Sequence, residues 1–138
     1  MTSYSIVSSI FNICLTLNVF ESDIKYPSNT IMTVCVESDG FSANTDMDID
    51  IKQFVVFVDN LATLYSMLNG KAVIKEPYGE EQFLEFSGNR TGHICIRGRL
   101  CSNGRNGFIQ ELIFENCIDQ TFLPKFIREL SALCAKYR

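Results

Sequence analysis

Three segments in the first third of the chain are rich in apolar, β-branched and aromatic residues, a composition typical of β-strands. They are residues 12–20 (NICLTLNVF), 30–37 (TIMTVCVE) and 41–49 (FSANTDMDI). In the third segment apolar and polar positions alternate, so we expect one face of this strand to be buried and the other to meet water. Asp39 and Gly40 precede it and favour the positive φ angles of a tight hairpin turn.

After Asp50 the spacing of apolar residues changes from that of a strand to that of a helix. Apolar side chains then recur at steps of three and four residues, which places them on one face of an amphipathic helix. They are Phe54, Phe57, Val58, Leu61, Leu64, Tyr65 and Leu68. The pattern predicts a helix over about 51–68, with Asp50 as its N-cap and Gly70 as its C-terminal cap.

Four further strand-like segments follow, separated by short stretches of turn residues such as Pro77-Tyr78-Gly79. They are residues 71–76 (KAVIKE), 81–86 (EQFLEF), 92–100 (GHICIRGRL) and 107–115 (GFIQELIFE). Strands this close along the chain pair antiparallel with their neighbours. The sequence therefore predicts an α+β fold, in which about seven strands form an antiparallel meander sheet with two amphipathic helices in the order βββ-α-ββββ-α.

A short polar stretch, Asp119-Gln120-Thr121, separates the last strand-like segment from a second helical pattern that runs to Tyr137. Pro124 is tolerated only in the first turn of a helix, where its missing N–H has no partner to lose. The polar side chains before it are therefore expected to cap the helix by accepting hydrogen bonds from its free N–H groups. This capping role is favoured over a reactive site.

Length and composition are those of a globular chain, with 138 residues, 46% hydrophobic and 20% charged. We expect residues 1–138 to form a single domain with one core. No apolar run approaches the roughly 20 residues that span a membrane, and the first residues lack the features of a signal peptide. A cytoplasmic location without membrane binding is the default expectation. The net charge of −4 disfavours nucleic acid as a partner and favours a basic protein.

The residues that most often carry chemistry do not form a catalytic set in this sequence. The one histidine, His93, shares a strand face with Cys95, but no third group orients the pair. The six cysteines include no Cys-x-x-Cys pair, and we expect them to be reduced and structural. A calcium loop beginning at Asp46 needs Gly and Glu where the chain has Ile51 and Phe57. The sequence predicts no enzyme, no catalytic residue, no cofactor and no metal site.

Exposed acidic residues are the remaining candidates for a functional surface. Asp46 and Asp48 lie on the polar side of a predicted strand, and Glu80 and Glu81 follow a turn. Such groups are most often solvated surface residues, but complementary charge also speeds and directs association with a basic protein. These four carboxylates are the predicted partner-binding residues.

Arginines at 97, 99 and 105 surround the turn near the end of the third quarter of the chain. Arg97 and Arg99 fall on one side of their strand, where they are expected to pair with Glu111 and Glu115 across a hairpin. A nucleic-acid surface needs more cations and aromatic side chains beside them.

Three stretches resemble a family of small bacterial immunity proteins, described as WapI-like and associated with polymorphic toxins. They are residues 61–74 (LATLYSMLNGKAVI), 92–100 (GHICIRGRL) and 119–124 (DQTFLP). The resemblance extends from about Thr33 to the end of the chain. It implies a non-catalytic protein that binds and neutralises a cognate toxin, and the acidic charge favours a basic, nuclease-type toxin. The alternatives are a structural or protein-interaction module, including a homodimer, and an enzyme with an unrecognised carboxylate or thiol site.

Overall fold

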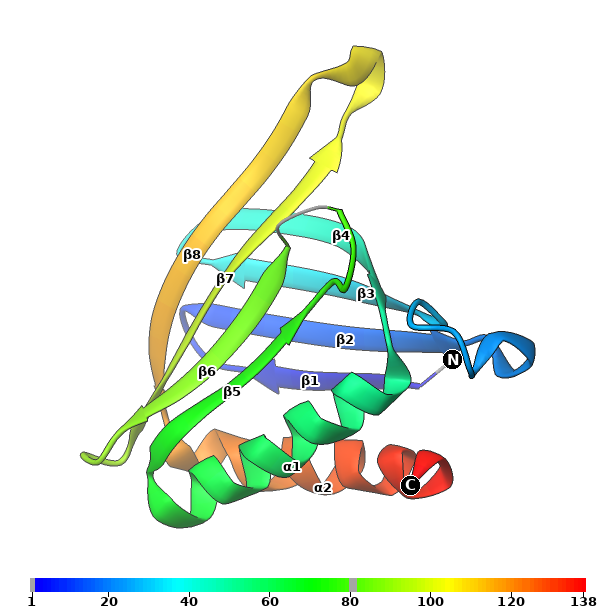
Figure 1. Cartoon of the computed structure of the whole chain (residues 1–138). Helices are drawn as coiled ribbons and strands as arrows, with labels where there is room; N and C mark the ends of the chain where they lie inside the picture. The colour runs from blue at the N-terminus through cyan, green and yellow to red at the C-terminus, as the bar shows by residue number, and fades with distance from the viewer. Residues whose placement is uncertain (1, 80–81) are drawn as a thin grey trace.

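The computed structural model describes residues 2–79 and 82–138, which form two four-stranded antiparallel sheets and two α-helices (Figure 1). The first sheet consists, in order, of β1 (Ser3–Val7), β2 (Phe11–Val19), β3 (Thr30–Ser38) and β4 (Phe41–Ile49). Helix α1 (Ile51–Met67) connects it to the second sheet. That sheet consists, in order, of β5 (Asn69–Lys75), β6 (Phe83–Asn89), β7 (His93–Asn103) and β8 (Ile109–Asp119). Helix α2 (Leu123–Cys134) follows β8.

The predicted α+β class with antiparallel strands and two helices is confirmed, but the strand count and the single meander are wrong. The described residues contain eight strands in two sheets, because Ser3–Val7 forms an additional first strand. Its five residues pair with β2 and bury only Tyr4 and Ile6, a pattern too short to stand out in the sequence. A second difference concerns the end of α1, where Leu68 and not Gly70 adopts the left-handed cap, with φ of 51°.

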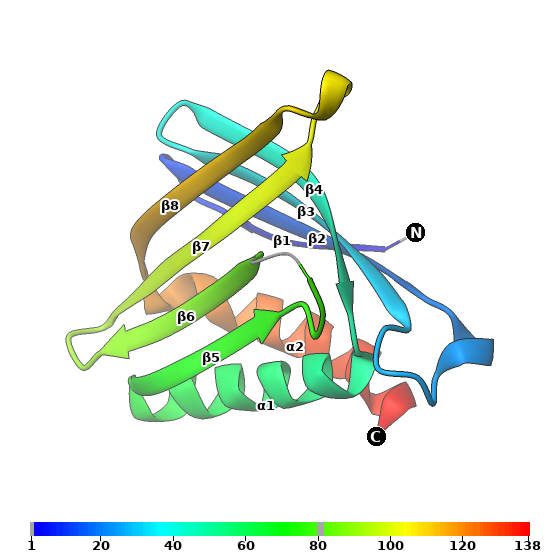
Figure 2. The same cartoon turned by 45° about the horizontal axis from the view of Figure 1, so that its top comes forward.

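The two sheets pack face to face with their strands crossing, and the two helices lie side by side along the open side of the pair (Figures 1 and 2). Rings from both sheets meet in the core, since Phe11 of β2 and Phe114 of β8 stack with centroids 5.7 Å apart. Helix α1 packs against β5 and against α2, which in turn reaches β1. The helices therefore close the space between the two edge strands β1 and β5.

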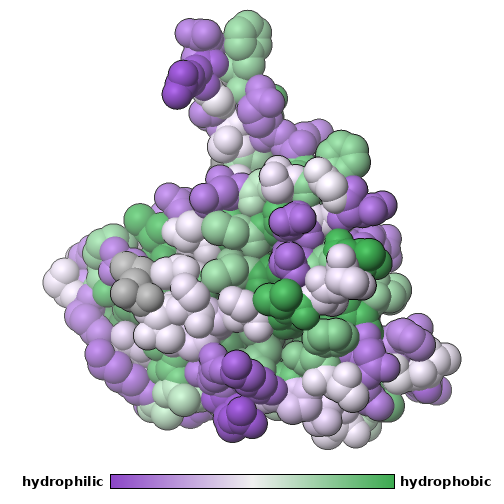
Figure 3. All heavy atoms as spheres, turned by 180° about the vertical axis from the view of Figure 1, so that it is seen from behind, coloured by the Kyte–Doolittle hydropathy of each residue, from purple (hydrophilic) through white to green (hydrophobic). Residues whose placement is uncertain are grey.

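Strands β7 and β8 extend beyond the other strands of both sheets. Their ends and the turn between them form a projecting hairpin arm, residues 102–110 (Figures 1 and 3). Figure 3 shows this arm standing clear of the remaining surface. Its tip contains Arg105, and the Phe108 side chain there is 70% exposed. The arm therefore contributes little to the core.

Cys95 of β7 and Cys117 of β8 form a disulfide, so the prediction that all the cysteines are reduced is wrong. The two residues lie directly opposite each other, with Cα atoms 4.0 Å apart. In the same ladder the Gln120 N–H donates to the Gly92 carbonyl, which makes those two a hydrogen-bonded pair. Hydrogen-bonded and non-hydrogen-bonded pairs alternate along a ladder. Cys95 and Cys117 lie an odd number of residues from Gly92 and Gln120, so they form a non-hydrogen-bonded pair, in which side chains lie closest.

The polar stretch before α2 caps a 3₁₀ turn and not α2 itself, so the predicted role is wrong for the helix, whose N-cap is Phe122 without a side-chain hydrogen bond. The Asp119 carboxylate accepts the Thr121 N–H at 2.9 Å and caps a short 3₁₀ turn, Gln120–Phe122, which leads into α2. Pro124 lies in the first turn of α2, as predicted. The hydrogen bond from the Thr121 backbone lowers the pKa of Asp119 below its ordinary value. The Asp119 side chain therefore has a structural role at the junction between β8 and the 3₁₀ turn.

Candidate functional site

Asp46 and Asp48 are exposed on β4, as predicted, and both line a cleft of about 540 Å³. The cleft lies between β4, the segment before β6 and strand β7. Its lining residues are Asn44, Thr45, Asp46, Asp48, Glu76, Gln82, Cys101 and Ser102. Three of them are carboxylates and, among the described residues, none is Lys or Arg. We call this region the acidic cleft.

Gln82 holds the acidic cleft together from its floor, where its side chain is 4% exposed. Its amide nitrogen donates to the Asp46 carbonyl at 2.9 Å, and its amide oxygen accepts the Thr45 hydroxyl at 2.8 Å. The same oxygen accepts the Cys101 N–H at 3.2 Å. One buried amide thus ties the segment before β6 to β4 and β7, so the carboxylates above it are held on a common frame.

Glu76 is the acidic residue that the sequence did not indicate. Its carboxylate accepts the Asp48 N–H at 3.0 Å, which brings it onto β4 from a position 28 residues later in the chain. Only the tertiary structure makes this contact, because the strand-like pattern ends at Glu76 without showing which strand lies beside it. The other two predicted partner-binding residues, Glu80 and Glu81, lie outside the described residues.

Cys95, which shares a strand face with His93, is bonded to Cys117. His93 is exposed at the start of β7, where it lies opposite Asp119 in the ladder. No group of three or more His, Cys, Asp or Glu side chains in the described part of the chain is arranged to hold a metal ion. Within residues 2–79 and 82–138, neither helix combines the length and the apolar character required to span a membrane. The acidic cleft, which contains two of the predicted partner-binding residues, is therefore the candidate surface.

A comparison with known protein families identifies the chain. The profile of the immunity protein WapI-like family matches residues 8–138. The chain belongs to the WapI-like immunity protein family. The match also covers β2 and most of the segment before Thr33, where the stretches noticed in the sequence did not extend. Searches among curated proteins and among solved structures found no match.

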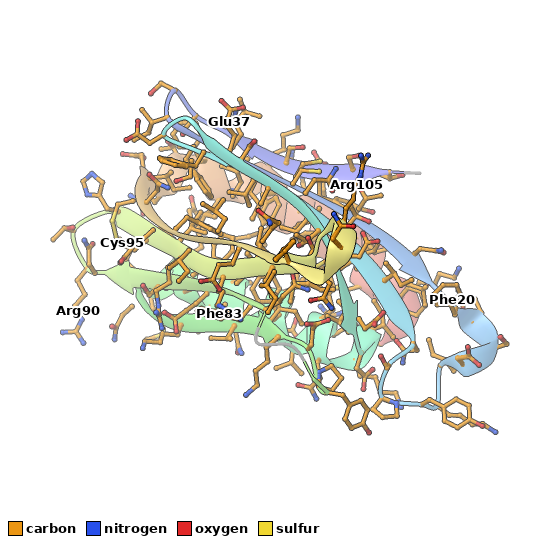
Figure 4. The ribbon with its side chains drawn as sticks, turned by 90° about the horizontal axis from the view of Figure 1, so that it is seen from above. Phe20, Glu37, Phe83, Arg90, Cys95 and Arg105 are labelled. Atoms are coloured by element: carbon orange, nitrogen blue, oxygen red, sulfur yellow. A yellow bond between two sulfur atoms is a disulfide. The ribbon has the colours of Figure 1, made fainter. Side chains whose placement is uncertain are left out.

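The second sheet of this immunity protein presents a different surface, on which the charges neutralise one another. Arg97 was expected to pair with Glu111 or Glu115, but its Nε donates to Glu85 of the neighbouring strand β6. Its guanidinium also lies over the Phe83 ring, 5.3 Å from the centroid. In Figure 4, Phe83 and Glu37 mark opposite sides of the molecule, one on each sheet. Arg97 is thus held by contacts within its own sheet.

The expected pair across the β7–β8 hairpin is confirmed for one arginine. Arg99 binds the Glu111 carboxylate with its Nη2 at 2.7 Å and its Nε at 3.0 Å. Glu115 lies directly opposite Arg97 in the ladder and adds a favourable charge. With these carboxylates beside them, the charges of Arg97 and Arg99 are balanced within their own sheet.

The Glu85–Arg97 pair predicts how the stability of the immunity protein depends on pH. The hydrogen bond from Arg97 lowers the pKa of Glu85 below its ordinary value of 4.5. A lowered folded-state pKa means that the pair stabilises the fold above about pH 4.5 and that this contribution is lost as pH falls through the lowered pKa. Because the Arg97 side chain is 49% exposed, solvent screens the pair and keeps its contribution small.

We expect Glu85→Gln to lower the free energy of unfolding more at pH 7 than at pH 3, as measured by urea denaturation at both values. Glu37→Gln, at an exposed position on the other sheet, is the matched control and should show no such difference. Equal losses at both pH values would contradict an electrostatic contribution from Glu85.

Proposed function

We propose that this immunity protein neutralises its toxin by binding it through the acidic cleft, and that the toxin is a basic, nuclease-type protein. The observation that carries the proposal is the gathering of Asp46, Asp48 and Glu76 on one cleft that no described cation lines. The net charge of −4 acts in the same direction at longer range.

Inhibition then requires binding alone, without turnover of a substrate. A nuclease must hold an anionic phosphate backbone, so the surface around its active site is cationic. The carboxylates of the acidic cleft can bind this cationic surface of the toxin in place of the phosphates of its substrate. A stable inhibitory complex of standard size buries about 1,600 Å² in total, so residues around the cleft also take part. Complementary charge raises the association rate more than it changes the lifetime of the complex.

The test is the double substitution Asp46→Lys with Asp48→Lys, mixed with the candidate toxin, the product of the gene immediately upstream. We expect the association rate at low salt to fall by about tenfold or more, since steering of this kind changes rates by 10- to 1,000-fold. Rapid-mixing fluorescence measures the rate, and thermal unfolding shows that the fold is kept. Both side chains are exposed, so the melting temperature should change little.

A matched control changes the net charge equally at a distance from the acidic cleft. Asp23→Lys with Glu129→Lys replaces carboxylates on the short turn after β2 and on α2. If both double variants slow association equally, net charge acts and the acidic cleft is not the contact. If the upstream product does not copurify with this protein, and its toxicity is not relieved by coexpression, the proposed toxin is wrong.

A further inference from the structure

A second pair of cysteines lies face to face across the first sheet. Cys14 of β2 and Cys35 of β3 are direct partners in the ladder, and both side chains are half-buried free thiols. They line a groove of about 450 Å³ on the outer face of this sheet. The polar side chains of Ser5, Asn12 and Asn44 also line the groove, so its walls suit small polar molecules. Both thiols can therefore be reached by one reagent from solvent.

The register gives this pair a different geometry from the Cys95–Cys117 disulfide. At the two ends of the β2–β3 hairpin the Phe20 N–H donates to the Asn29 carbonyl, and the Asp39 N–H donates to the Ile10 carbonyl. Both pairs are an even number of residues from Cys14 in an unbroken register, so Cys14 and Cys35 form a hydrogen-bonded pair. Opposed Cα atoms in such pairs are about 5.5 Å apart, which is within the usual range for disulfides.

Burial lowers the reactivity of the Cys35 thiol. Burial, followed by the neighbouring Cys14 thiol and Asp46, raises the pKa of the Cys35 thiol. Because the thiolate is the attacking form, Cys35 is a poor first nucleophile at neutral pH. It can still attack a sulfur that is already bonded to Cys14, since the two are then held side by side and the step is intramolecular.

We propose that Cys14 and Cys35 form an oxidisable dithiol, which small-molecule disulfides convert reversibly into a second cross-strand disulfide. The Cys14 thiolate attacks one sulfur of the small disulfide and releases its other half as a thiolate. Cys35 then loses its proton and attacks the Cys14 sulfur of this mixed disulfide, which releases the second half. Two protein thiols are oxidised by two electrons, and one external disulfide is reduced to two thiols.

The test treats the folded full-length protein with hydroxyethyl disulfide, a neutral reagent chosen because Glu37 borders the groove. We expect the thiol count after unfolding to fall from four to two, and the mass to fall by two hydrogens. Peptide mapping should find Cys14 linked to Cys35. Cys101 and Cys134 are internal controls, because both are buried, and burial raises the pKa of Cys134 to about 11.

The variant Cys35→Ser removes the second attack and is expected to retain one hydroxyethylthio group on Cys14. Serine is close to cysteine in size and is tolerated at this half-buried position, and the wild-type measurement does not depend on the variant folding. Two hydroxyethylthio groups on the wild-type protein, or four unreacted thiols, would overturn the proposal. So would Cys35→Ser remaining unmodified, because Cys14 would then be out of reach of the reagent.

Discussion

Replacement of Phe86 by alanine is expected to lower the free energy of unfolding by about 3–5 kcal/mol, the usual cost of removing a buried aromatic side chain. Phe86 of β6 is fully buried. Its ring contacts Phe57 of α1 edge to face at 5.7 Å and stacks with Phe126 of α2 at 6.2 Å. One ring therefore joins the second sheet to both helices, and its removal leaves a cavity at their junction.

The matched control for this prediction is Phe108→Ala, which makes the same change on the projecting arm. The Phe108 ring is 70% exposed, so its removal should change the free energy of unfolding by less than about 0.5 kcal/mol. Urea denaturation measures both variants under the same conditions. A loss under about 1 kcal/mol for Phe86→Ala would show that the core rearranges to fill the space and that the three rings do not depend on one another.

The second large effect is expected at Asn29, whose side chain is fully buried just before β3. Its amide nitrogen donates to the Ile24 carbonyl at 3.1 Å, the Tyr26 carbonyl at 2.8 Å and the Asp50 carboxylate at 3.2 Å. Its amide oxygen accepts the N–H of Ile51, the first residue of α1, at 2.9 Å. Asn29 thus links the loop after β2 to the start of α1.

Asn29→Ala removes all these bonds and leaves buried backbone groups without a partner, so we expect a loss of about 3 kcal/mol in the free energy of unfolding. Asn18→Ala is the matched control, because Asn18 is exposed on β2 and its truncation should cost almost nothing. Hydrogen exchange adds a local measurement, in which the Ile51 amide should lose protection in the first variant only. Unchanged protection there would mean that another group replaces the Asn29 oxygen.

The sequence pattern predicted only part of the candidate site. Alternation along β4 placed Asp46 and Asp48 on the wet face, and the structure confirms their exposure. Whether they contact a toxin stays a prediction. Glu76 and Gln82 complete the acidic cleft, but they lie beside β4 only because the two sheets cross at this end of the molecule. No local sequence pattern predicts how the two sheets cross.

The cysteines illustrate the same limit in another way. Spacing along the chain did not separate Cys95 and Cys117 from the other four, and the expectation of reduced thiols was wrong for these two. Two cysteines on neighbouring strands can bond only where the register places them opposite each other on the same face, and a shift of one residue separates them. A register that is unknown by one residue therefore leaves the bonding state undecided.

The sequence by itself determined the α+β class, both amphipathic helices, the cap of α1 at Asp50, the tendency of Asp119 to bond the backbone just after it, and the resemblance to the immunity family. These properties depend on local periodicity and on side chains that hydrogen-bond within a few residues. The tertiary structure alone decided the division into two sheets, the Glu85–Arg97 pair, the acidic cleft and the state of each cysteine pair. All of these arise from contacts between strands distant in sequence, and their geometry is set by sheet packing and register.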